Sequence, residues 1–312
     1  MIKRIIFLLL VLLTSAGVIN AQQLTIQEKL GYSKTTKLLI VHADDLGLSH
    51  SENLATIYAL ENGTVNSGSI MVPCPWFAEI AAYARSHPNI DLGLHLTLTS
   101  EWEFYKWGPI LSSTEVPSLI NDQDFFYDGI ENFAQNAKED DIEKELRAQI
   151  DRAIKFGINP THLDCHMFSL LINPEFLTIY LNLGREYKLP VLLNKEGAKN
   201  YFNIDLEAYT TDDDILVDYA FMAMPENYKN GLDKTYTEIL RSLHYGLNVI
   251  ILHAAYDNLE MQGITVNKPD WGSAWRNEDF TFFTSDKCKE IIEKENIQLI
   301  TWGEIRNKLL SN

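Results

Sequence analysis

Cysteine and basic charge are both scarce in this chain. Three cysteines among 312 residues, Cys74, Cys165 and Cys288, cannot form a disulfide scaffold, and no CxxC pair occurs among them. At most one intramolecular disulfide could form, so we expect all three to be small buried apolar residues. Lys and Arg number 26 against 43 Asp and Glu, which gives a formal net charge of −17. Such a chain repels phosphate, so we expect neither nucleic acid nor an anionic membrane as its main partner.

Several motifs that mark common enzyme classes are missing. No GxGxxG follows a predicted strand and no GxxxxGK[ST] occurs, so the sequence gives no support for nucleotide-dependent chemistry. A GxSxG motif is also lacking, which removes support for a serine hydrolase of the nucleophile-elbow type.

The only long apolar run lies at the N-terminus. Lys3 and Arg4 precede an apolar run over residues 5–13, and residues 19–21 resemble a cleavage site. This layout is typical of a secretory signal peptide over residues 1–21, and the run is too short to span a bilayer comfortably. An uncleaved anchor is the less favoured alternative. We therefore expect an exported protein, periplasmic or extracellular, with no stable membrane span after cleavage.

Beyond Ala21, short β-rich runs alternate with helical patterns. About eight strands are predicted, at residues 37–43, 67–72, 91–98, 161–165, 190–193, 215–219, 249–252 and 298–302. Strands that alternate with helices indicate βαβ units and a mostly parallel sheet. We therefore predict an α/β fold, a closed or nearly closed β/α barrel, as a single domain over residues 22–312. An open doubly wound sheet is the alternative.

Residues 99–136 form a long irregular stretch rich in aromatic and acidic side chains, and loops of that length are usually functional. Trp102 and Trp107 lie in this stretch, and Trp271 and Trp275 lie in a later loop-like segment. Such aromatic side chains either stack on sugar rings or pack a lid onto the rim of a barrel, and the sequence does not decide between the two roles.

Histidine and aspartate recur where the predicted strands end. Asp44 and Asp45 close the first strand, His95 lies on the third, His166 follows the fourth, and His253 follows the run VIIL. Because the carboxyl ends of parallel strands meet on one face of a β/α fold, these side chains are expected to converge there. Core packing does not explain so many ionisable groups at strand ends, so the pattern points to an active site.

One aspartate and two histidines from separate strands form a ligand set for a divalent metal. This donor set suits Zn²⁺ or, with more water, Mg²⁺, Mn²⁺ or Fe²⁺, and it leaves the second aspartate free to act as a base. On its own, the Asp44-Asp45 pair could equally be a helix N-cap and turn. We interpret His162 as structural, and His42 as at most an outer partner of the site.

At these residues the sequence resembles the YdjC-like carbohydrate deacetylases, a group that includes chitooligosaccharide deacetylases. The resemblance rests on HADDLGLS, NGTVNSGSIMV, DLGLHLTLTSEW and THLDCH in that order, and it extends to WRNEDFTFFTS and IQLITWGEI. It implies a distorted (β/α) barrel that binds a divalent metal ion, Mg²⁺ or Zn²⁺, and removes acetyl groups from N-acetylated sugars.

By this resemblance, Asp45, His95 and His166 are metal ligands, Asp44 is the catalytic base and His253 is the acid. The chain departs from the family pattern in two places. His166 is followed by Met-Phe-Ser instead of further histidines, and His253 by Ala-Ala instead of Pro-Gly.

The expected partner is an acetylated oligosaccharide, and a homodimer is compatible with the sequence. Two alternatives remain open at this stage. One is another metal-dependent hydrolase, an amidase or a phosphoesterase, and the other is a non-catalytic carbohydrate-binding protein with the same fold.

Overall fold

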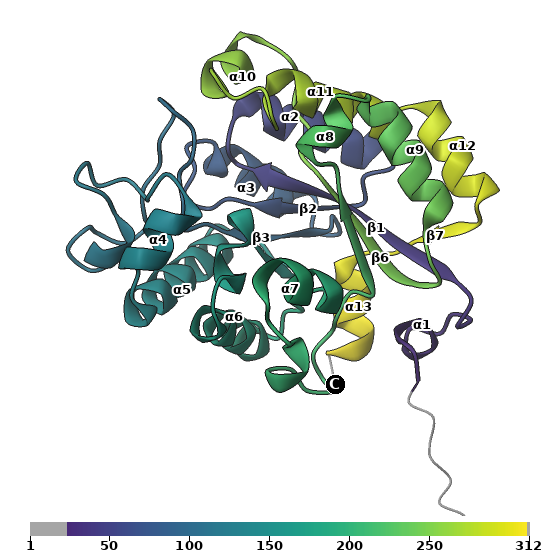
Figure 1. Ribbon diagram of the computed structural model, residues 1–312, viewed down its shortest axis with the longest axis horizontal. Helices are drawn as coiled ribbons and strands as arrows, with labels where there is room; N and C mark the ends of the chain where they lie inside the picture. The colour runs from purple at the N-terminus through teal and green to yellow at the C-terminus, as the bar shows by residue number, and fades with distance from the viewer. Residues whose placement is uncertain (1–23, 311–312) are drawn as a thin grey trace, which may run out of the picture.

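Strand β1 (Lys37–Leu46) lies at the centre of a parallel sheet, and every residue of the strand after the first is buried (Figure 1). The computed structural model describes residues 24–310, and the predicted signal peptide lies outside them. In the described part the sheet has seven strands in the order β4-β3-β2-β1-β6-β5, with β7 also paired to β1. The remaining strands are β2 (Ser67–Ile70), β3 (Leu92–Leu96), β4 (Leu163–Cys165), β5 (Tyr219–Met222), β6 (Gly246–Leu252) and β7 (Ile297–Leu299).

The two edges of the sheet, β4 and β5, approach each other through short bridges. Leu163 of β4 forms a single parallel pair with Val191, and Asn194 forms another with Val217, just before β5. The sheet therefore curls into a distorted barrel in which one part of the wall is almost free of regular strand. This confirms the predicted α/β barrel.

Helices surround the sheet, with α2, α9, α11 and α12 on one side and α5, α6, α7 and α13 on the other (Figure 1). The helices are α1 (Ile26–Lys29), α2 (His50–Asn62), α3 (Phe77–Ser86), α4 (Ile130–Asn136), α5 (Glu139–Lys155), α6 (Pro174–Tyr187), α7 (Lys195–Phe202), α8 (Pro225–Tyr228), α9 (Leu232–Ser242), α10 (Leu259–Ile264), α11 (Ser273–Phe283), α12 (Asp286–Lys294) and α13 (Trp302–Leu309). Short 3₁₀ turns are η1 (Pro117–Leu119), η2 (His166–Leu171) and η3 (Leu206–Ala208).

Successive side chains of β1 point alternately to the outer helices and to the inside of the barrel. Leu39 and Val41 pack with side chains of the outer helices, whereas Leu38 and Ile40 face inward and pack with Trp302 of α13. Side chains of a strand point alternately to its two faces, so His42 and Asp44 continue the inward row. The inside of the barrel is thus apolar at the amino-terminal end of β1 and polar at its carboxyl end.

The predicted strands differ from the observed ones in their bounds, and the differences are largest for the three predicted at residues 190–193, 215–219 and 298–302. Residues 190–193 form only a single bridge. Leu163 donates to the carbonyl of Pro190 and accepts from Leu192, whereas Pro190 has no N–H with which to extend the pairing. Residues 215–218 precede β5, which begins at Tyr219. The last strand ends at Leu299, since Thr301 caps α13 in a capping box with Glu304.

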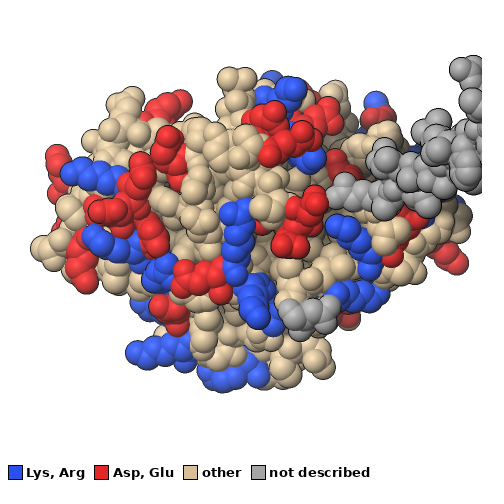
Figure 2. All heavy atoms as spheres, turned by 90° about the horizontal axis from the view of Figure 1, so that it is seen from below, with Lys and Arg blue, Asp and Glu red and all other residues tan. Residues whose placement is uncertain are grey.

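Several other predictions hold. The long irregular stretch over residues 99–136 contains only η1 and α4 among its helical turns and helices. The three cysteines are buried and unpaired, as expected. Within residues 24–310 no helix is long and apolar enough to cross a membrane. Figure 2 shows acidic and basic side chains interspersed on one face of the molecule, so the acidic excess does not form a continuous patch there.

Candidate active site

A column of aromatic rings leads from the apolar end of the barrel to its polar end. The ring of Trp302 stacks on that of His162 at 5.2 Å, and His162 meets His42 edge to face at 4.9 Å. His162 fits because Gly93 lies beside it on β3: a Cβ there would lie 2.4 to 2.6 Å from three ring atoms of His162. His162 is therefore a packing residue, as the sequence predicted, and the polar site begins at His42.

A bulge at the end of β1 brings two adjacent carboxylates to the same site. The pairing of β1 with β2 shifts register between Ala43 and Leu46, and Asp45 has a φ of 67°, in the left-handed region. A regular strand would send Asp44 and Asp45 to opposite faces, whereas a bulge re-aims one of them. The N-cap of the following helix is Ser49, so the alternative role of the aspartates as a helix cap is wrong.

Asp45, His95 and His166 form a buried cluster. Oδ1 of Asp45 lies 3.4 Å from Nε2 of His95 and 3.4 Å from Nδ1 of His166, and the two nitrogens are 3.2 Å apart. No hydrogen bond reaches Oδ1 of Asp45, although the atom is buried. A buried carboxylate oxygen without a donor is costly, and two imidazole nitrogens beside it complete a set of divalent-metal ligands. The three residues therefore fit a metal ion.

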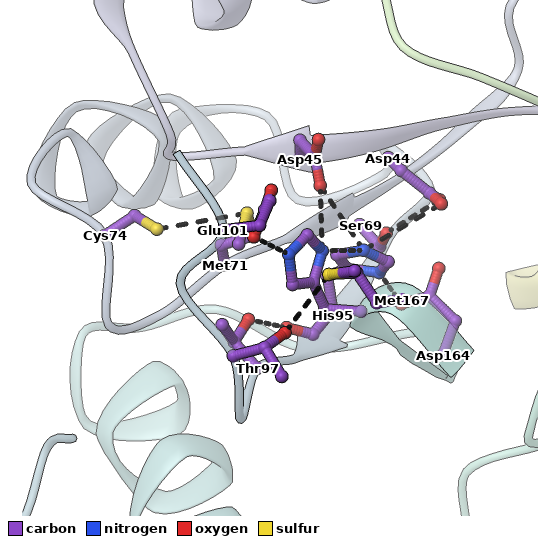
Figure 3. A network of polar contacts seen from close by, with 12 residues as sticks. Asp44, Asp45, Ser69, Met71, Cys74, His95, Thr97, Glu101, Asp164 and Met167 are labelled. Atoms are coloured by element: carbon purple, nitrogen blue, oxygen red, sulfur yellow. Dashed lines mark hydrogen bonds and ion pairs between the residues drawn. The ribbon is translucent and has the colours of Figure 1, made fainter. Parts of the chain in front are cut away.

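Each histidine of the cluster is held by a carboxylate on its other nitrogen. Nδ1 of His95 lies 2.7 Å from Oδ1 of Asp164, and Nε2 of His166 lies 2.9 Å from Oε2 of Glu101 (Figure 3). Such carboxylate partners fix the orientation of a ligating imidazole and raise its basicity. Burial alone would lower the pKa of His166, but Glu101 and Asp45 raise it to about 9.

Two other groupings of potential ligands include Asp164, with His42 and His162 or with Asp44 and His95. Both oxygens of Asp164 are already engaged, one by His95 and the other by His42 at 2.7 Å. These groupings therefore fit an ion less well than the cluster around Asp45.

Arg276 of α11 holds the other oxygen of Asp45. Its Nη2 lies 2.9 Å from Oδ2 of Asp45, and its Nη1 donates to Oε1 of Glu52 on α2. All three side chains are buried. Burial alone would raise the pKa of Asp45, but the Arg276 guanidinium and the two imidazoles hold it well below its usual range. Burial raises the pKa of Glu52, so this carboxyl tends toward its neutral form.

Asp44 lies beside the cluster and is held by groups of its own. Its Oδ1 is 3.0 Å from Nε2 of His42 and accepts a hydrogen bond from Ser69 at 3.4 Å, while its Oδ2 is 3.9 Å from Nε2 of His95. Burial would lower the pKa of His42, but its contacts with Asp164 and Asp44 raise it to about 9. His42 thus carries positive charge at neutral pH and orients Asp44.

His253 follows β6 on a segment that is fastened to two helices. Its backbone N–H donates to Oδ2 of Asp279 at 3.1 Å, Thr56 donates to the carbonyl of Ala254, and the N–H of Ala255 donates to the carbonyl of Arg276. These bonds fix the segment although it lacks the Pro-Gly that the resemblance led us to expect after His253. The pKa of His253 is lowered to about 4, chiefly by burial. The charge of Arg276 also lowers this pKa, whereas the charge of Asp45 raises it.

The structure gathers Asp44, Asp45, His95 and His166 as the sequence predicted, and it sets His253 within electrostatic range of Asp45. The sequence reasoning gave no role to the charged residues that support them, which are Glu52, Glu101, Asp164 and Arg276. Asp164 and Glu101 could have been found, because they lie inside the motifs THLDCH and LTLTSEW. Glu52 and Arg276 are 224 residues apart, and nothing in the sequence links them.

Three of the four tryptophans considered for sugar stacking are buried. Trp102, Trp107 and Trp275 expose 4%, 3% and 1% of their surface, so they pack the rim of the barrel. Arg276 lies over the ring of Trp102 at 5.4 Å, which places that tryptophan behind the cluster.

Comparison with known proteins gives consistent matches. A model of the YdjC-like protein family matches residues 38–294. The carbohydrate deacetylase of Geobacillus stearothermophilus is 35% identical over 270 residues, covering 85% of this chain and 96% of that protein. The chitooligosaccharide deacetylase of Serratia marcescens is 33% identical over 166 residues, covering 52% of this chain and 62% of that protein.

The fold of this chain is also similar to that of a solved structure. A candidate cellobiose-phosphate cleavage protein of Enterococcus faecalis V583 superposes with a TM-score of 0.72 at 26% identity, covering 86% of this chain and 98% of that one. The stretch matched by the family model, residues 38–294, contains every residue of the site described above.

Proposed function

The chain belongs to the YdjC-like family, and we propose that it is a metal-dependent hydrolase that removes acetyl groups from N-acetylated carbohydrates. The names of its relatives supply the substrate class. The observation that carries the proposal is the unpartnered Oδ1 of Asp45 between two imidazole nitrogens, with the carboxylate of Asp44 alongside.

Asp45, His95 and His166 would hold the ion. Two nitrogens and one oxygen suit Zn²⁺, and a more hydrated Mg²⁺ is the other candidate from the sequence. A divalent cation bound there would supply positive charge to acidify water and to stabilise the oxyanion that forms on the acetyl carbonyl. Asp164 and Glu101 support this role, because each holds one nitrogen of an imidazole ring. The other nitrogen of that ring, which would bind the ion, is then turned toward Asp45.

Asp44 is proposed to be the general base. Its carboxylate is fixed by His42 and Ser69 but keeps one oxygen, Oδ2, on the side of His95. That oxygen is available to take a proton from water, which then attacks the acetyl carbon.

His253 is proposed to donate a proton to the leaving sugar nitrogen. With its pKa lowered to about 4, it is neutral before reaction. It can therefore donate only after it has taken over the proton that Asp44 removes from water, and this transfer returns Asp44 to its carboxylate form. An imidazolium of low pKa is a strong acid, which favours rapid transfer to the departing amine. The three hydrogen bonds that hold residues 253–255 support this role, because they fix the backbone that carries the ring.

Acetate release tests the proposal. Purified protein is incubated with N-acetylated oligosaccharides, O-acetylated oligosaccharides and sugar phosphates, each with and without a chelator, followed by Zn²⁺ or Mg²⁺. We expect acetate from the N-acetylated sugars, loss of release with chelator, and recovery with metal. Release of phosphate in place of acetate would favour the phosphoesterase alternative, and metal binding without any hydrolysis would favour the non-catalytic one.

We also propose that the protein is exported after cleavage behind Ala21, on the strength of the charged and apolar segments at residues 3–13. Mass spectrometry of the protein recovered from the expressing cells would show an N-terminus at Gln22 if this is right, and at Met1 if it is not. The homodimer stays a prediction, which sedimentation analysis of the same sample would test.

A further inference from the structure

A polar groove opens beside the active site, and we call it the outer groove. It has a volume of about 780 Å³ and is lined by residues of the segments 101–106 and 120–128, by α4 and by Lys268. Lys268 lies on the segment that follows β6, and the other lining residues follow β3. Helix α4 lies beyond the carboxyl ends of the strands (Figure 1). The volume lies within the range of small-ligand sites.

The outer groove borders the Asp45, His95 and His166 cluster through one residue. Glu101 lines the groove, and its Oε2 is 2.9 Å from Nε2 of His166. A sugar chain whose acetyl group reaches Asp45 and His166 therefore has the groove as the space for its neighbouring units.

Backbone hydrogen bonds hold the walls of the groove. The N–H of Ser100 donates to the carbonyl of Tyr127 at 2.8 Å, and that of Phe126 to the carbonyl of Trp107 at 3.2 Å. Across the mouth, Asn267 donates to Glu103 at 2.9 Å and ties the segment that carries Lys268 to the opposite wall. A site formed in advance binds without the cost of ordering its loops.

The lining suits a ligand rich in hydroxyl and amide groups. Side-chain amides and one phenol line the groove, whereas Ile120 is the only aliphatic residue in the lining. Amides and hydroxyls supply paired donors and acceptors, which match the hydroxyls of a sugar. The lining has four carboxylates and two lysines, so it disfavours a phosphorylated ligand.

We propose that the outer groove binds the uncharged or amino-sugar units next to the unit being deacetylated, with Gln123 and Tyr127 as contacts. This inference rests on the proposed function, because it assumes that an N-acetylated oligosaccharide reaches the cluster. Contacts to remote units of a substrate raise the efficiency of reaction at the reactive unit. The protein should therefore prefer longer, unphosphorylated chains.

The test compares Tyr127→Phe and Gln123→Ala with Gln135→Ala, which changes an exposed residue of α4 that does not line the groove. Chitooligosaccharides of one to five units are used in two measurements. One is kcat/KM for acetate release, and the other is calorimetric binding to chelator-treated protein, which needs no turnover. A 6-phosphorylated disaccharide serves as the charged probe. Circular dichroism confirms that each variant is folded.

We expect affinity and kcat/KM to rise with chain length in the unchanged protein and in Gln135→Ala. Each groove variant should lose about three- to tenfold on the longer chains and nothing on the monosaccharide, which is the effect of one hydrogen bond. An equal loss on all lengths, no gain with length, or tighter binding of the phosphorylated sugar would overturn the proposal. Length-dependent binding without acetate release would support the role of the groove and refute the proposed function. Acetate release that the groove variants leave unchanged would support the proposed function and refute the role of the groove.

Discussion

Nη2 of Arg276 lies 2.9 Å from Oδ2 of Asp45, and both side chains are buried. This contact occupies one oxygen of the carboxylate and leaves Oδ1 turned toward His95 and His166. A carboxylate free to rotate would offer either oxygen to an ion or to the guanidinium. The contact between helix α11 and the bulge at the end of β1 therefore orients the proposed metal ligand.

Arg276→Lys should weaken metal binding. Lysine cannot reproduce the fork that joins Asp45 to Glu52, and outer partners of metal ligands typically contribute about 10- to 100-fold in affinity. Glu52→Gln should bind metal almost as well as the unchanged protein, because Glu52 already tends to be neutral and the amide oxygen still accepts from Arg276. Titration with Co²⁺, followed by its absorption spectrum, measures both variants. Equal affinity in Arg276→Lys would show that the contact does not orient Asp45.

Asp44→Asn and Asp45→Asn should separate two functions of neighbouring residues. The first should retain metal and lose about 10²- to 10⁴-fold in acetate release, the usual contribution of a general base. The second should lose metal and activity together. Metal content by mass spectrometry and acetate release are measured on the same samples. The proposed roles fail if Asp44→Asn remains active or if Asp45→Asn keeps its metal.

Metal affinity should increase with pH. In the metal-free protein the pKa of His166 is about 9, so an incoming cation has to displace a proton from this histidine below that pH. The apparent affinity should rise by up to about tenfold per pH unit for each proton released. His95 adds to this dependence, because Asp164 and Asp44 raise its pKa well above the usual range. Calorimetry in buffers of different ionisation enthalpy counts the protons. Glu101→Gln removes the main group that raises this pKa, so it should flatten the dependence above neutral pH.

The loss of activity in His253→Ala should depend on the leaving group of the substrate. An amide needs its nitrogen protonated, whereas an activated aryl ester does not, so the variant should lose far more activity on N-acetylated sugars than on p-nitrophenyl acetate. Rates on the two substrates are compared for the variant and for the unchanged protein. A similar loss on both substrates would assign His253 to binding or to structure.

Gly93→Ala should destabilise the protein by about 1–3 kcal/mol, the usual range for overpacking, because its Cβ would collide with the buried ring of His162. Gly263→Ala is the matched control, since no atom lies within 4 Å of the added Cβ and the residue lies in α10. That change should be neutral or slightly stabilising. Chemical denaturation measures both, and equal stability of the two variants would refute the packing role of Gly93.

The sequence was most informative where local pattern determines position. A buried parallel strand followed by polar residues places those residues at the carboxyl edge of the sheet, so Asp44, His95 and His166 could be predicted to meet. The fold class followed from the same alternation of strands and helices. Residues 190–193 look like a strand by composition, but they form only one bridge, between Val191 and Leu163.

Longer-range features could not be predicted from one sequence. The approach of Asp45 to the site depends on a register shift between β1 and β2, and residue pattern does not encode such a shift. The link between Glu52 and Arg276 joins α2 to α11, and it becomes visible only when both helices are packed against the sheet. The burial of Trp102 and Trp107 likewise depends on how the 99–136 segment folds over the rim.

The central claim is that the Asp45, His95 and His166 cluster holds a single divalent ion needed for deacetylation. Acetate release from an N-acetylated chitooligosaccharide, measured while chelator-treated protein is titrated with Zn²⁺ or Mg²⁺, tests it most directly. The account predicts no release without metal, a linear rise that ends at one equivalent for a tightly bound ion, and no recovery in His166→Ala. Full activity in metal-free protein, or recovery in His166→Ala equal to that of the unchanged protein, would contradict it.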